Sequence, residues 1–234
     1  MAKRPIFVAN LEGNCYFKEI EIEFTWGGNK NLKDHQKSIE SLHSNFRSKT
    51  KGKYEILEVS TKSKIELGKN LSAFNLHFYT KNNHKFTVES LFQGSKVFEK
   101  GGPYHDIYFN SSLDAKKDER LKNSGAITGF KYFDRIFENN PVTFFYDWLY
   151  INTLCLNKEL LNSILIYDAF SDIEFNPKRS VNCQAKALAL LKSIIERGEL
   201  EEILKNPKFL KKILMQDACI NNNQITFTEK SDYN

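Results

Sequence analysis

The feature that most constrains the fold of this chain is a change in its hydrophobic pattern at Pro141. Before that residue, β-branched and aromatic side chains alternate or run together in residues 4–10, 15–26 and 54–60, as is typical of strands. Residues 31–49 interrupt them with apolar residues at mostly helical spacing. After Pro141 the apolar spacing is helical. The sequence therefore predicts an α+β fold that is mainly helical with a small β-sheet. It begins with a strand, strand, helix, strand unit and has a helical layer in the second half.

Further elements follow from local signals. We expect a polar connection at 62–70, a strand at 71–80 with a turn after it, and helices at 86–100 and 112–125, the second ended by Gly125. The later helices are expected at 141–157, with Pro141 in the first turn, at 158–170, at 181–197 with Ser180 as cap and Gly198 as end, and at 206–214. Residues 221–234 are predicted to be a frayed tail.

Composition narrows the class of protein. A chain of 234 residues with 41% hydrophobic content can bury one sizeable core, and we expect a single domain. No apolar run approaches the roughly 20 residues that cross a bilayer, and the apolar segment at the start is short for a signal peptide, so a cytoplasmic location without membrane association is expected. The four cysteines form no CxxC pair, and the histidines show no metal-ligand spacing, so no metal is predicted. The net charge of +5 suits an anionic ligand, although many enzymes have such a charge without one.

Residues 86–100 carry the most informative polar pattern. If they form one helix, an apolar face from Val88 to Phe98 lies beside a polar face with Glu89, Gln93, Lys96 and Lys100. From the spacing alone, a solvated charged face on an amphipathic helix is the simpler explanation of this pattern. Two details favour a site: Gly94 is costly inside a helix unless something approaches its backbone, and "GGPY" follows directly.

Two segments of the sequence resemble a known family. "LSAFNLHF" followed by "FTVESLFQGSKVFE" is similar to the core motif of the NADAR (YbiA-like) superfamily, a Ser-Asn-Phe type strand and then Glu-His-x-x-Gln-x-x-Lys on a helix. Residues 145–185 resemble a later part of the pattern, a helix pair followed by an acidic loop. The resemblance covers about 65–195 and implies a NADAR-like core at 65–198, with an N-terminal extension at 1–64 and C-terminal helices and tail at 199–234.

The match departs from the commonest YbiA-like form. Ser90 replaces the His after Glu89, Ala73 and Asn75 surround the strand Phe, and no Trp-Gly follows the acidic loop. The sequences of residues 88–104 and 172–185 instead resemble the NADAR branch that is associated with DarT-type ADP-ribosyltransferase toxins. That branch implies an antitoxin enzyme that removes ADP-ribose from guanine bases in DNA, without a cofactor.

The chemistry of that reaction suits the residues of the motif. Breaking an N-glycosidic bond to ribose passes through an oxocarbenium-like state, which needs a carboxylate near the anomeric carbon. Glu89 is the expected carboxylate, and Asp172, with Glu174 beside it, is the second acidic candidate. The alternative for Asp172 and Glu174 is a purely structural role, in helix capping or in salt bridges. Lys96 is either an electrostatic partner of Glu89 or an amine nucleophile that forms a transient Schiff base with the opened ribose.

Other residues are expected to bind ADP-ribose. Lys178, Arg179 and the start of the following helix suit a diphosphate, because helix N-termini attract anions and Arg pairs with phosphate through parallel donors. Tyr146 or Trp148 would stack on a base, although packing in the core explains both equally well. The resemblance and these arguments together predict an ADP-ribose site made of Ser72, Phe74, Asn75, Gln93, Gly101, Gly102, Tyr104, Trp148, Lys178, Arg179 and Asn182.

Three functions are consistent with the sequence. The leading hypothesis is the DNA ADP-ribosyl glycohydrolase, with ADP-ribosylated DNA as substrate and a DarT-type toxin as functional partner. The second is a YbiA-like N-glycosidase that acts on a phosphorylated metabolite of the riboflavin pathway. The third is an ADP-ribose-binding module without turnover.

Overall fold

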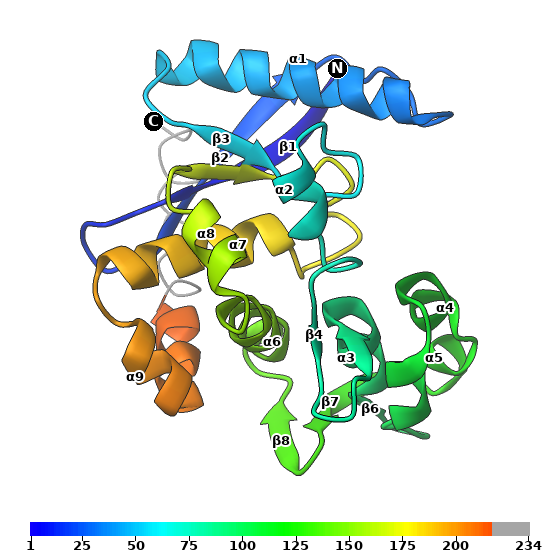
Figure 1. The fold of residues 1–234 in the computed structure, drawn as a ribbon. Helices are drawn as coiled ribbons and strands as arrows, with labels where there is room; N and C mark the ends of the chain where they lie inside the picture. The colour runs from blue at the N-terminus through cyan, green and yellow to red at the C-terminus, as the bar shows by residue number, and fades with distance from the viewer. Residues whose placement is uncertain (217–234) are drawn as a thin grey trace, which may run out of the picture.

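The fold is built around a four-stranded sheet. The computed structural model describes residues 1–216. The strands β1 (Ala2–Ala9), β2 (Phe17–Phe24), β3 (Ile56–Glu58) and β9 (Ala169–Ser171) lie in the order β2-β1-β9-β3 (Figure 1). β1 is antiparallel to β2 and to β9, whereas β3 is parallel to β9. The sheet therefore joins the N-terminal strands to a strand from the second half of the chain.

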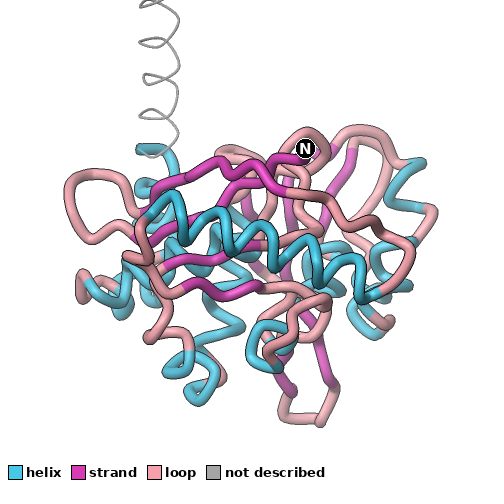
Figure 2. The backbone as a smooth tube through the Cα atoms, turned by 90° about the horizontal axis from the view of Figure 1, so that it is seen from above, coloured by secondary structure: helices cyan, strands magenta, loops and turns pink. Residues whose placement is uncertain are grey.

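The alternation of side chains along these strands places two apolar layers on opposite faces of the sheet. Ile6 and Val8 of β1 pack in a cluster with Leu42 and Phe46 of α1 (Leu32–Thr50), whereas Phe7 belongs to the cluster on the other face. α1 lies across its face of the sheet (Figures 1 and 2). The predicted helix at 31–49 is confirmed, with Asn31 as the N-cap. The period-two pattern of β1 thus encodes two cores at once.

The opposite face is covered by helices. α8 (Gln184–Glu196) packs on it, and α6 (Phe144–Cys155) lies beyond α8 (Figure 1). α6 is apolar on nearly every side and is buried over most of its length, as expected for a helix enclosed by other elements. α7 (Lys158–Ser163), α9 (Leu200–Lys205) and a further helical segment at 207–216 complete this layer.

A second group of elements packs against the start of α6. Its three-stranded antiparallel sheet has the order β6-β7-β8, with β6 (Lys96–Phe98), β7 (Ile127–Tyr132) and β8 (Arg135–Glu138). Around it lie the hairpin of β4 (His77–Tyr79) and β5 (Lys85–Thr87), α3 (Val88–Gly94), the 3₁₀ helix η1 (His105–Phe109), α4 (Ser112–Lys117) and α5 (Arg120–Asn123) (Figure 1). The short helix α2 (Glu66–Asn70) lies instead beside β3 of the four-stranded sheet (Figure 1). The α+β class is borne out, with more strands than the small sheet that was predicted.

The predicted helix at 86–100 is wrong in its length. α3 ends at Gly94, and Lys96 begins strand β6, where it pairs with Phe130. The carbonyl of Ser95 accepts a 2.8 Å bond from the Lys131 amide, and the carbonyl of Gly94 accepts one of 2.9 Å from Tyr104. Distant segments therefore take the carbonyls that a longer helix would use, and Lys100 does not extend the polar face of α3.

The predicted helix at 158–170 is also wrong in its second half. α7 ends at Ser163, and Ala169–Ser171 form β9 between β1 and β3. A short apolar run in a buried strand has no polar alternation, so its pattern does not differ from that of a buried helix.

Smaller corrections concern turns. The strand expected at 71–80 is restricted to β4, because the carbonyl of Ser72 accepts bonds from the amides of Asn75 and Leu76 in a turn. The polar connection at 62–70 contains α2, and the charged helix expected at 112–125 is divided into α4 and α5.

The helix starts in the second half also differ. Pro141 precedes α6, whose N-cap is Thr143, and its carbonyl accepts a 3.0 Å bond from the Phe144 amide. Cys183, and not Ser180, is the N-cap of α8. The predicted end at Gly198 is confirmed, since this residue follows α8 with a φ of +74°.

Two expectations concern the ends and surroundings of the chain. The predicted tail at 221–234 lies outside the described residues. Within residues 1–216, no helix combines the length and the apolar character that a bilayer crossing requires.

Candidate active site

A cavity of about 360 Å³ lies between α3, β7, the loop after β9 and the start of α8. Seven of the predicted site residues line it: Ser72, Phe74, Glu89, Gln93, Lys96, Asp172 and Asn182. Its volume falls within the range of small-ligand sites. The cavity thus unites the motif on α3 with the acidic loop about 80 residues later.

The start of α3 positions Glu89. The Thr87 hydroxyl accepts a 3.1 Å bond from the Ser90 amide, and the Ser90 hydroxyl accepts one from the Thr87 amide, which forms a capping box. The Glu89 amide donates to the carbonyl of Ala73 at 2.9 Å. Ser90, which stands where the commonest YbiA-like form has His, therefore has a structural role in this chain.

Three polar side chains form a hydrogen-bonded row along the cavity wall. Gln93 donates from Nε2 to Oε1 of Glu89 at 2.9 Å, one helical turn away. Lys96 donates from Nζ to Oε1 of Gln93 at 2.6 Å. Glu89 and Gln93 are 7% and 8% exposed, so the row lies at the edge of the core and not on a solvated face.

The amine of Lys96 lies in an unusual environment. Burial lowers the pKa of Lys96 to about 8, although the charge of Glu89 opposes this shift, and Lys116 adds to the lowering. Nζ also lies 4.8 Å from the centroid of the Phe92 ring. A substantial fraction of this amine is therefore neutral at mildly alkaline pH, as a nucleophile requires.

Asp172 lines the same cavity from the loop after β9. Its Oδ1 accepts bonds from the amides of Glu174 at 3.0 Å and Phe175 at 3.2 Å, so it shapes the loop as well as lining the cavity. Burial raises the pKa of Asp172 well above its usual range, and the charges of Glu58 and Glu174 raise it further.

Glu58, which sequence reasoning missed, is a buried carboxyl behind Asp172. Its Oε1 accepts bonds from the Ser60 hydroxyl at 2.7 Å and the Ile173 amide at 2.9 Å, and its Oε2 accepts one of 2.5 Å from Ser171. Burial raises the pKa of Glu58 to about 7. The charged residue inside the apolar strand "EILEV" was the available signal in the sequence.

Gln184 and Tyr146 also reach the cavity from the helical layer. Gln184 accepts a 2.6 Å bond from the Ala73 amide and donates one of 2.5 Å to the Val59 carbonyl, which joins the start of α8 to the loop that carries Phe74. Tyr146 is buried against Phe92 with their ring centroids 5.2 Å apart. Tyr146 was predicted only as a stacking or core residue, and Gln184 carried no signal.

Lys116 is the other lysine that lines the cavity. It is exposed on α4, and its Nζ lies 5.0 Å from the centroid of the Phe74 ring. Asn182 lies at the far wall, and its buried Oδ1 has no hydrogen-bond partner within the described residues. A ligand with an anionic group and a hydrogen-bond donor would complement these two side chains.

Comparison with known proteins identifies the family of the chain. Residues 2–224 match the family described as the DarT1-associated NADAR antitoxin. The chain belongs to this family. NADAR proteins are generally N-glycosidases. No curated protein matches the chain.

In this NADAR protein, the "GGPY" segment packs against its own chain and does not line the cavity. A Cβ on Gly102 would lie 2.3 Å from the Lys96 carbonyl, and Gly101 lies against the Tyr104 side chain. The Tyr104 hydroxyl lies 2.6 Å from that of Ser124. The close approach expected at Gly94 is also internal, because a Cβ there would lie 2.7 Å from the Tyr108 ring.

Four further predicted residues of this NADAR protein lie away from the cavity. Asn75 is exposed and donates to the Lys69 carbonyl at 2.9 Å. Trp148 is buried among the aromatic rings of α6 and β8, with its ring centroid 4.7 Å from that of Phe137. Lys178 and Arg179 are exposed in the turn before α8 and are not among the residues that line the cavity. Their roles in binding ADP-ribose stay predictions.

Proposed function

We propose that this chain is a DNA ADP-ribosyl glycohydrolase, the antitoxin that removes ADP-ribose which a DarT1-type toxin attaches to guanine bases. The observation that carries the proposal is the row of Glu89, Gln93 and Lys96 along one wall of a small-ligand cavity. Family membership supports the role as antitoxin.

The carboxylate of Glu89 would stabilise the positive charge that develops at the anomeric carbon as the bond to the base breaks. Gln93 holds the carboxylate in place through a 2.9 Å hydrogen bond. Because Glu89 is only 7% exposed, its interaction with a buried sugar would be weakly screened by water.

Two roles of Lys96 fit its place in the row. As a cation it would balance the charge of Glu89. As a neutral amine it would attack the anomeric carbon of the opened ribose, form an imine as the base departs, and be released when water hydrolyses the imine to free ADP-ribose. The pKa of about 8 supports the second role, since it makes the neutral amine available.

The rest of the cavity suits ADP-ribose. Lys116, an exposed residue of the lining, provides a cation for the diphosphate, and Asp172 adds a second carboxyl group to the lining. Aromatic rings of Phe74, Phe92 and Tyr146 provide surfaces for a base or a sugar.

The proposal is tested by incubating the full chain with a single-stranded oligonucleotide that carries ADP-ribose on one guanine. We expect free ADP-ribose and the unmodified oligonucleotide as products, resolved by chromatography and mass spectrometry. Tight binding of ADP-ribose without release would identify a binding module instead. Turnover of a phosphorylated riboflavin-pathway metabolite, with no release from DNA, would favour the YbiA-like activity.

A further inference from the structure

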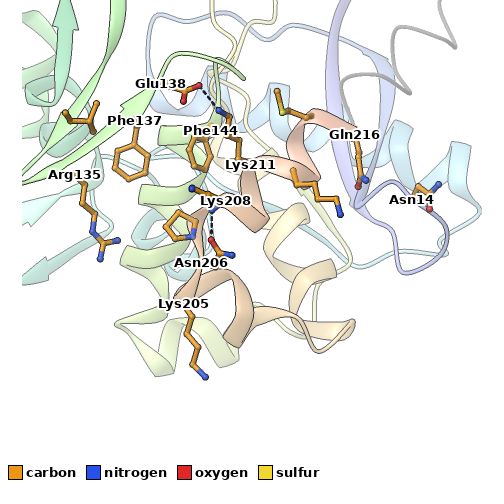
Figure 3. Close-up of a pocket in the computed structure, with 14 residues that line it drawn as sticks. Asn14, Arg135, Phe137, Glu138, Phe144, Lys205, Asn206, Lys208, Lys211 and Gln216 are labelled. Carbon is orange, nitrogen blue, oxygen red and sulfur yellow. Dashed lines mark hydrogen bonds and ion pairs between the residues drawn. The ribbon is translucent and has the colours of Figure 1, made fainter.

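A groove of about 1040 Å³ lies on the molecule and is distinct from the candidate active site. It runs between β8, the start of α6 and the helical segment at 207–216 (Figure 3). Five cations line this basic groove: Arg135, Lys205, Lys208, Lys211 and Lys212. Glu138 is the one carboxylate among the described lining residues. The groove therefore carries a strong excess of positive charge.

Part of this charge is free to bind a ligand. Lys211 pairs with Glu138 at 2.6 Å, and Lys205 pairs with Glu201 at 2.5 Å. Lys208 and Lys212 are exposed, and within residues 1–216 neither has a carboxylate at ion-pair distance. These two lysines lie four residues apart, so they project from the same side of the helical segment.

The floor of the basic groove is apolar. Phe137 and Phe144 lie there with their ring centroids 5.6 Å apart (Figure 3). Ile136 is 81% exposed and Met215 is 43% exposed, both at the edge of the groove. Large apolar side chains so exposed beside cations are typical of a surface that contacts flat, charged ligands.

One short segment of the chain contributes residues to both the basic groove and the candidate active site. Glu138 lines the groove and the next residue, Asn139, lines the cavity. In the same way, Val142 lines the cavity and Phe144 lines the groove. The segment between β8 and α6 thus lines both, which places the basic groove next to the cavity.

We propose that the basic groove binds the single strand of DNA that flanks the modified base. The proposal rests on the proposed function, because it assigns the groove to the polymer that carries the substrate. Phosphates contact Lys208 and Lys212, and bases lie against the apolar floor. An acidic peptide would satisfy the lysines, but the combination of spaced cations with an aromatic floor favours a strand that alternates phosphates and flat rings.

The test measures binding of an unmodified, fluorescent single strand of about 15 nucleotides to the full chain. We compare wild type with Lys208→Ala/Lys212→Ala, and use Lys30→Ala/Lys33→Ala as the matched control, because these exposed lysines lie at the start of α1, away from the groove (Figure 1). The groove variant should bind at least about fivefold more weakly at low salt, with a salt slope reduced by about 1.4 for two lost phosphate contacts. The control should bind within about twofold of wild type.

Three outcomes overturn the proposal: no binding of the strand by wild type, equal losses in both variants, or unchanged binding in the groove variant. Unchanged strand binding together with lost binding of an acidic peptide would assign the groove to a protein partner. Because the probe carries no ADP-ribose, this result does not depend on the glycohydrolase activity. Conversely, if the protein released no ADP-ribose but its strand binding depended on Lys208 and Lys212, the proposed function would be refuted and the DNA-binding role of the groove would stand.

Discussion

Lys96 lies on a strand, yet its Nζ donates a 2.6 Å hydrogen bond to Oε1 of Gln93 on the preceding helix. The turn at Ser95 folds the chain back, so that the amine is held in line with Glu89 although no helix connects them. The short bond and the burial restrict the amine to one side of the cavity. This relationship leads to the first prediction.

Lys96→Arg separates the two roles of the amine. If Lys96 attacks the sugar, the variant is inactive, because a guanidinium stays protonated. Borohydride added during wild-type turnover should then leave a stable ADP-ribose adduct on the peptide that contains Lys96, detected by mass spectrometry. An active Arg variant and no adduct would exclude the covalent route and leave Glu89 and water to carry the reaction.

The pH dependence of the rate gives a second reading of the same question. With a pKa of about 8, the neutral amine increases as pH rises, so a nucleophilic Lys96 makes the rate rise up to about pH 8 and then level. A purely electrostatic Lys96 predicts the opposite sign, a loss of rate above about pH 8.

Glu89→Gln should abolish turnover and leave the affinity for ADP-ribose within about tenfold of wild type. The amide keeps the shape and its hydrogen bond with Gln93, but it lacks the charge that the transition state needs. Single-turnover kinetics and calorimetry measure the two effects separately. A near wild-type rate would make Glu89 a structural residue only.

The diphosphate has two candidate binding sites, which substitutions can compare. Lys116 lines the cavity, whereas Lys178 and Arg179 lie outside its lining. We expect Lys116→Ala to weaken ADP-ribose binding by about fivefold to tenfold, measured by calorimetry at low salt, because it removes the cation nearest the rim. Lys178→Ala/Arg179→Ala is the matched comparison. A larger loss in that double variant would restore the diphosphate site predicted before α8.

Glu58→Gln should change how stability depends on pH. Burial raises the folded pKa of Glu58 from 4.5 to about 7, so the folded state retains a proton that the unfolded state loses. Wild type is therefore destabilised relative to the variant as pH rises from about 4.5 to about 7, by up to about 3 kcal/mol. Denaturant unfolding of both proteins across this range measures the difference. A constant difference would mean that Glu58 stays ionised in the fold.

His43 makes a second contribution to the pH dependence of stability in that experiment. Its Nε2 lies 2.8 Å from the Ser171 hydroxyl, which in turn donates to Glu58. Burial lowers the pKa of His43 to about 4, so its contribution rises with pH between about 4 and 6.5, opposite in sign to that of Glu58. The Glu58→Gln variant should accordingly show the rising trend of His43 more clearly than wild type does.

Local patterns were sufficient for part of this protein. The alternation in β1 and the spacing of Ile39, Leu42 and Phe46 in α1 depend only on neighbours in the sequence, and both elements form as predicted. The spacing of four between Glu89 and Gln93 placed them on one face of a helix, and their side chains are hydrogen-bonded there. Such contacts are contained within a single element, so the sequence by itself determined them.

Contacts between distant segments decided the rest. α3 ends at Gly94 because β7, more than 30 residues later, pairs with Lys96, and residues 169–171 become a strand because β1 and β3 offer unpaired edges. The same long-range packing buries Glu58 behind Asp172 and brings Lys116 to the cavity. Backbone groups bond to whichever partner the packed chain presents, and burial sets the pKa of a side chain only once its neighbours are in place, so these features depend on the tertiary structure.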